Sequence, residues 1–194
     1  MANLLAIHSV GDSLVTYLRN SYPESLRAAH PSEFRLLSSG ELAGRDLPAP
    51  MLSFFLYRVT ANEHLRNTRS PNGLSNVAVP LSVDLHYLMT VWADSALAEH
   101  TILAWAMHQL HRHPVLDASS LSPEAEWGAG DFIHVIPAEL STEDIMRIWD
   151  AVEPPYRLSV SYIARVVRIE ADPVPDALAV VASRFSWSDG ERQP

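Results

Sequence analysis

Hydrophobic and polar residues alternate with the most regular period in "PLSVDLHYLMTVWAD", residues 80–94. Alternation with a period of two places successive side chains on opposite faces of a β-strand. One face carries Leu81, Val83, Leu85, Tyr87, Met89 and Val91, and the other carries Ser82, Asp84, His86, Leu88, Thr90 and Trp92. Twelve residues in a strand would span about 40 Å, which is long for a small domain. We therefore expect this strand to project past the core and to belong to an interface.

The same patterns predict further strands and helices along the chain. Alternation or enrichment in aromatic and β-branched residues predicts strands over 33–38, 51–60, 131–137 and 156–170. Helical spacing of apolar residues, with capping signals at Asp94 or Ser95 and at Ser141 or Thr142, predicts helices over 3–20, 95–112 and 140–152. The predicted fold is α+β: a mostly antiparallel or mixed β-sheet with long strands, flanked by about three helices.

Polar and proline-rich stretches separate these elements. Residues 21–50 read as an irregular segment, 61–79 as a polar loop with a Pro-Asn-Gly turn, and 117–130 as another loop. Pro173 and Pro175 end the last long strand. We expect one domain over residues 1–170, followed over 171–194 by a C-terminal tail or arm with the apolar centre "ALAVVASRF".

Composition and charge narrow the classes of function. The 194 residues carry a net charge of −9, and every one of the 14 basic residues is an arginine. This balance argues against binding to nucleic acid, which relies on dense positive charge. The absence of cysteine removes disulfides, thiolate metal sites and cysteine nucleophiles. The sequence shows no signal peptide and no apolar run of about 20 residues, so we expect a cytoplasmic protein that does not insert into a membrane.

Histidines gather in "EHTILAWAMHQLHRHPVL", residues 99–116. They are His100, His108, His111 and His113. His108 and His111 are neighbours on a helix surface, but the His-Glu-x-x-His pattern of a zinc helix is missing. The dipole of a helix favours cationic side chains near its C-terminus. We therefore interpret the cluster as a polar helix edge without chemistry.

One arrangement leaves a catalytic alternative open. Asp84 and His86 point the same way on the long strand, and Asp94 or His100 could complete a set of metal ligands. The competing interpretation is a polar strand face that meets neighbouring groups or another subunit. No Gly-rich phosphate loop and no Gly-x-Ser-x-Gly motif occurs. We assign no catalytic, cofactor-binding or metal residue, and keep a metal-dependent enzyme using Asp84, His86 and His100 as the alternative.

Five separated segments together resemble one family. They are "LYRVTANEHLRN", "VPLSVDLHYLMTVWAD", "EHTILAWAMHQLHRHPVL", "IMRIWDAV" and "YRLSVSYIARVV". In order and spacing they resemble the tail-terminator, or cap, proteins of extracellular contractile injection systems, over roughly residues 4–170. The most specific parts are the arginine–asparagine loop at 58–67, the run at 80–88, and Trp149 followed by Tyr-Arg-x-Ser-x-x-Tyr at 156–162.

The resemblance implies a structural protein without cofactors. Such caps form a ring, commonly a hexamer, on the distal end of an inner tube and its contractile sheath, end polymerisation and tie the two layers together. The implied partners are further copies of the chain together with sheath and tube proteins. The implied particle assembles in the cytoplasm and is then released or stays with the cell. The other non-catalytic interpretation is an α+β partner-binding module outside any particle.

The expected contact surfaces are the 58–79 loop and the projecting ends of the 81–92 and 156–170 strands. The arginines and asparagines around the first strand end supply directional donors that can bind a partner or neighbouring carbonyls. The candidate interface residues are Arg58, Asn62, Arg66, Asn67, Arg69, Asp84, His86, Arg157, Arg165 and Arg168.

Overall fold

The central strand of the domain, β3 (Leu81–Trp92), has the bounds that its alternating pattern predicts. It is seen in a computed structural model that describes residues 2–44, 47–62, 80–152 and 154–170. β3 pairs antiparallel with β2 (Met51–Ala61) on one side and with β6 (Ser159–Ile169) on the other. The three long strands predicted from sequence are therefore confirmed, and they lie side by side.

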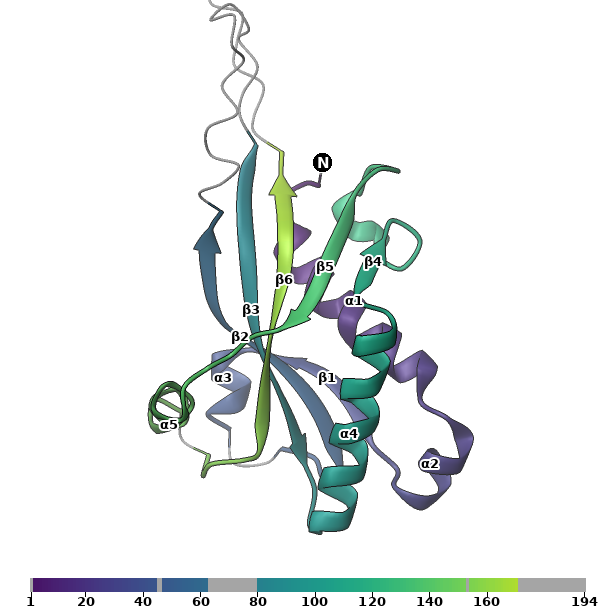
Figure 1. The fold of residues 1–194 in the computed structure, drawn as a ribbon, viewed down its shortest axis with the longest axis vertical. Helices are drawn as coiled ribbons and strands as arrows, with labels where there is room; N and C mark the ends of the chain where they lie inside the picture. Colours follow the sequence, from purple (N-terminus) through teal and green to yellow (C-terminus); the bar gives the residue numbers. More distant parts are fainter. Residues whose placement is uncertain (1, 45–46, 63–79, 153, 171–194) are drawn as a thin grey trace, which may run out of the picture.

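Three shorter strands complete a single sheet of six strands in the order β1-β2-β3-β6-β5-β4. β1 (Glu33–Leu37) pairs parallel with β2, whereas β5 (Phe132–Pro137) and β4 (Val115–Asp117) continue the antiparallel pairing from β6. The sheet is mixed, and with its helices it confirms the predicted α+β class. The upper ends of β2, β3 and β6 extend beyond the level of the helix α5, introduced below (Figure 1).

Two long helices pack against one face of this sheet. Helix α1 (Ala6–Ser21) and helix α4 (Ala96–Arg112) share the main core with the odd-numbered side chains of β3. Gly11 allows α1 to approach the sheet, because a Cβ atom there would lie 2.8 Å from both terminal methyl carbons of Leu36. Ser95 caps α4 by accepting a hydrogen bond from the amide of Ala98. Both predicted helices are confirmed to within a few residues of their ends.

A third helix covers part of the opposite sheet face. Helix α5 (Thr142–Asp150) begins at Ser141, whose side chain accepts a hydrogen bond from the amide of Asp144. The predicted apolar stripe packs on even-numbered side chains of β3 and their neighbours. This second cluster contains Leu37, Leu42, Met51, Leu88, Trp92 and Trp149, with Ile145, Ile148 and Val152 packed against it.

Several short elements were missed because they carry too few residues to show a period. Helix α2 (Glu24–Ala29) and helix α3 (Ser39–Leu42) lie in the segment expected to be irregular, although Ser38 and Glu41 form the capping box that begins α3. Strand β4 and the 3-10 turn η2 (Pro123–Ala125) lie beside or within the expected 117–130 loop. The predicted 61–79 loop, beyond Asn62, and the predicted tail at 171–194 lie outside the described residues. Within the described part of the chain, no helix combines the length and apolar character needed to cross a membrane.

Candidate interaction surface

Among the described residues, α5 and the side chains packed with it cover only the lower part of the sheet face that carries α5. We call the upper part of this face the open face. The strand register places on it Arg58, Thr60, Ser82, Asp84, His86, Phe132, His134, Ile136, Ile163, Arg165 and Arg168, with Asn62 just past the end of β2. The open face contains most of the described residues that the sequence predicts to form an interface.

Two polar pairs fix the centre of the open face. The side-chain amide of Asn62 donates to both carboxylate oxygens of Asp84, at 3.1 and 3.2 Å. Thr60 Oγ1 and His86 Nε2 share a hydrogen bond of 3.0 Å. Burial and the positive charge of Arg58 lower the pKa of His86 below its ordinary value, and Asp84 opposes this shift. His86 is therefore neutral at pH 7 and is held by its neighbours.

The alternative metal site does not form. Asp84 and His86 lie on the open face, whereas His100 lies exposed on α4, which packs against the other face of the sheet. Across the ranges that the structure describes, no group of three or more His, Asp or Glu side chains could hold a metal ion. His100, His108 and His111 are exposed on α4, as expected for a polar helix edge, and the His113 ring packs edge-on against Tyr17 at 5.8 Å.

Four arginines of the described chain are exposed without an internal hydrogen bond or ion pair; three of them lie on the open face, and the fourth, Arg112, lies on α4. Five arginines are held by internal carbonyls or carboxylates: Arg19, Arg27, Arg35, Arg147 and Arg157. Arg58, Arg165 and Arg168 are exposed and make no hydrogen bond or ion pair with another described residue. Guanidinium groups without internal partners are available for the planar, two-point bonding that carboxylates favour. The open face therefore presents cationic side chains without internal hydrogen bonds in an acidic protein, although the charge of Arg168 also acts on Asp131.

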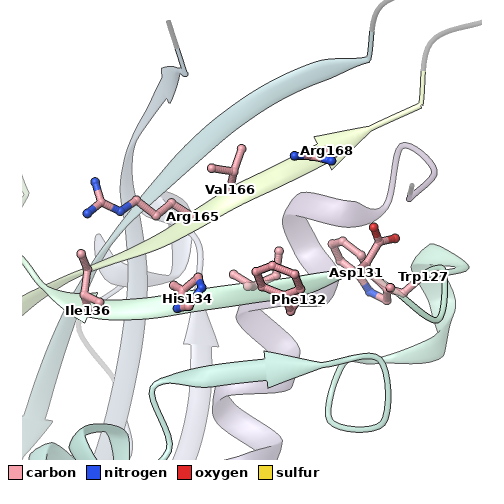
Figure 2. Close-up of a pocket in the computed structure, with 10 residues that line it drawn as sticks. Trp127, Asp131, Phe132, His134, Ile136, Arg165, Val166 and Arg168 are labelled. Carbon is pink, nitrogen blue, oxygen red and sulfur yellow. The ribbon is translucent and has the colours of Figure 1, made fainter. Parts of the chain in front are cut away.

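A groove of about 370 Å³ opens where β5 and β6 separate. The two strands pair only from Pro137/Tyr162 to His134/Arg165, and beyond that point β5 is paired only with β4, on its opposite edge. Figure 2 shows Phe132, His134 and Ile136 on β5 along one side, and Arg165, Val166 and Arg168 on β6 along the other. The Phe132 side chain is 57% exposed. This combination of an exposed ring and two arginines suits a partner that is both apolar and acidic.

One predicted interface residue, Arg157, makes its contacts at a different part of the sheet. Arg157 donates to the carbonyl of Ala93 and lies over the Trp92 ring, 5.8 Å from its centre, at the other end of β3. It therefore does not belong to the open face. The predicted interface residues Arg66, Asn67 and Arg69 lie outside the described residues.

Phe132 and His134 were not among the predicted interface residues. Their signal lies in "DFIHVIP", where alternation places both side chains on one face and Ile133 and Val135 on the buried face. An aromatic residue on the outer face of a short strand is the feature that could have revealed them.

Taken together, the fold is an α+β sheet domain with one helix-covered face and one half-open face. The family model described as the Pvc16 N-terminal domain matches residues 9–183, and this chain belongs to that family. No protein in the curated set matches the chain.

Two solved structures share the fold. A PVC sheath/tube terminator, in the extended state of an extracellular contractile injection system, is 20% identical, with a TM-score of 0.57 over 96% of this chain and 64% of that one. The tube-terminating cap of the anti-feeding prophage is 16% identical, with a TM-score of 0.54 over 93% of this chain and 59% of that one. The chain thus spans less than two thirds of the length of either protein.

Proposed function

We propose that this chain is the structural terminator of a contractile, phage-tail-like particle. It forms a ring, a hexamer in the simplest case, at the distal end of the inner tube and sheath. There it ends polymerisation and ties the two layers together. Its role is structural and requires no cofactor. Assembly takes place in the cytoplasm, and the particle is then released or stays with the cell.

The observation that carries this proposal is membership of the Pvc16 N-terminal domain family over most of the chain. Two proteins that share the fold are a sheath/tube terminator and a tube-terminating cap. The open face adds a physical reason, because its free arginines and exposed Phe132 suit contact with another polypeptide better than solvent alone.

Strand edges supply a route for such contacts. β1 pairs with β2 only over Met51–Phe55, so no described strand covers the outer edge of β2 from Leu56 to Ala61. Unpaired strand edges accept an extended segment from another chain through backbone hydrogen bonds. A terminator uses such contacts toward the last tube or sheath ring and offers no equivalent site on its distal side. Its own ring closes by a repeated contact between two different surfaces.

Deleting the chain from a particle-producing gene cluster tests the proposal. Electron microscopy of the purified particles should show tubes or sheaths of uncontrolled length, or sheaths detached at the distal end. Supplying the wild-type chain from a second copy should restore a uniform length. Particles of normal length and intact sheath without the chain would contradict the proposal.

A further inference from the structure

We infer that the groove between β5 and β6 receives helix α5 of a neighbouring copy and that this contact closes the ring. The inference rests on the proposed ring-forming function and names the partner of one part of the open face.

The groove side of the contact is cationic and apolar. Arg165 and Arg168 border it without hydrogen bonds to described residues, and Phe132 and Val166 supply apolar surface. Asp131 also lines the groove, but one of its carboxylate oxygens accepts a hydrogen bond from the amide of Gly128 at 2.8 Å. Arg168 also acts on the charge of Asp131. The two arginines outnumber this one carboxylate, so the groove has a small excess of positive charge beside its apolar surface.

The outer stripe of α5 has the complementary character. Residues spaced by three and four along a helix share one face, and on α5 this rule places Glu143, Met146, Arg147 and Asp150 together on the exposed side. The Met146 side chain is 38% exposed, although the opposite stripe of the helix is packed on the sheet. Arg147 is already paired with Glu143 at 2.6 Å, and Asp150 makes no ion pair within the described residues. The stripe therefore presents an apolar centre, with the unpaired carboxylate of Asp150 at its C-terminal end.

The two surfaces lie on different flanks of the molecule. In Figure 1, α5 lies at the lower left, seen nearly end-on, and β5 and β6, which line the groove, lie to its right. A chain therefore cannot fill its own groove with its own helix. Contact between different surfaces of identical chains is heterologous, and repeated rotation closes it into a ring. The arginines of the groove and the Asp150 carboxylate of α5 are complementary in charge, and a second copy of the chain is the occupant that we infer.

Cross-linking in assembled particles tests the contact directly, because the chain has no cysteine of its own. We would combine Phe132→Cys with Met146→Cys and treat particles with a short bismaleimide. The expected result is a ladder of covalent oligomers, since each copy links to both neighbours. The matched control combines Phe132→Cys with Met107→Cys, a methionine of similar exposure (39%) on α4, and should give no ladder.

Charge reversal gives a second readout that does not depend on cysteine. Arg165→Glu with Arg168→Glu should reduce incorporation of the chain into particles by about tenfold or more, as expected for reversed charges at a contact. Adding Asp150→Arg to the same chain should recover part of that loss, whereas Arg112→Glu alone, on α4, should have no effect.

The outcomes separate this inference from the proposed function. Particles that carry the chain at their ends but give no ladder, or the same ladder with the Met107 pair, overturn the inference and leave the terminator role intact. Reversal of Arg165 and Arg168 without loss of incorporation also overturns it. If the wild-type chain is absent from particle ends, the terminator role fails and the inference fails with it.

Discussion

The two halves of a single sheet face differ in what covers them. On β3, the even-numbered side chains of the lower half are Leu88, Thr90 and Trp92, and they are buried beneath or beside α5. In the upper half, on the open face, they are Ser82, which is 9% exposed, and Asp84 and His86, which are partly exposed. The strand and its register continue from one half to the other, so the change lies in the chemistry of the side chains.

Polar groups are satisfied differently in the two halves. In the covered half, Trp92 donates to Ser53 at 2.8 Å, and Thr90 bonds to Ser159 at 2.9 Å, so buried polar atoms pair with one another. In the open half, Asp84 and His86 are paired at the centre, but the arginines around them have no described partner. The covered half contributes to the stability of the fold, and we propose that the open half contacts another molecule.

Removing the main contact of α5 should have the largest effect. Trp149 is 4% exposed, and its ring lies 5.9 Å from that of Trp92. Trp149→Ala should lower the free energy of unfolding by about 3–5 kcal/mol, because it removes a large buried side chain and leaves a cavity. Urea unfolding measures this loss. A loss below about 1 kcal/mol would mean that α5 is not part of the stable core.

A buried hydrogen bond in the covered half should contribute less. Ser159 Oγ also donates to the carbonyl of Arg157 at 2.8 Å, so it keeps a partner when Thr90 is changed. Thr90→Val should therefore cost about 1 kcal/mol of unfolding free energy, the typical net value of one hydrogen bond. The same urea titration measures it, with Thr60→Val on the open face as the control with the smaller expected loss. An unchanged stability for Thr90→Val would show that this hydroxyl pair contributes nothing.

Acidification should affect the open half through His86. Its folded pKa lies below the ordinary value of 6.5, so as the pH falls the unfolded chain binds a proton on this residue before the folded chain does. The contribution of His86 to stability is therefore present above pH 6.5 and is lost as the pH falls through the window between 6.5 and the folded pKa. Thermal or urea unfolding at several pH values should show a smaller acid loss for His86→Gln than for wild type. An equal or larger acid loss in the variant would contradict this assignment.

Removing a free arginine should change stability least. Arg58 is exposed and has no hydrogen bond or ion pair to a described residue, so Arg58→Ala should change unfolding free energy by no more than about 0.5 kcal/mol. If the open face binds another chain, the same variant should nevertheless be incorporated less well into particles, as quantified by immunoblotting of purified particles. Arg112→Ala, an exposed arginine on α4, is the matched control and should be incorporated normally. A large loss of stability in Arg58→Ala would show that the open face is structural.

Local pattern predicted more of the fold than of the site. Alternation over 81–92 fixed both the bounds of β3 and the face on which Asp84 and His86 lie, because strand geometry is set by neighbouring residues. The uncovered half of the sheet follows from where α5 packs, which is a contact between distant segments. Arg157 shows the same limit: its partners Ala93 and Trp92 lie about 64 residues away, so sequence could not separate it from Arg165 and Arg168.

The groove was not predicted from the sequence, and the reason differs from that for Arg157. Its residues come from β5 and β6, which pair over only four residues before they separate. The point at which this pairing ends depends on contacts between distant segments, and β4, which pairs on the other edge of β5, has only three residues and no visible period. The sequence therefore did not indicate that Phe132 and His134 line a groove, although their alternation was present in it.

Cryo-electron microscopy of the distal ends of intact particles tests the central proposal most directly. We expect a closed ring of this chain in contact with the last tube and sheath subunits, with the open face buried against neighbouring polypeptides and α5 seated in the groove of the next copy. Distal ends that lack the chain, or a ring in which the open face is exposed to solvent, would contradict the proposal.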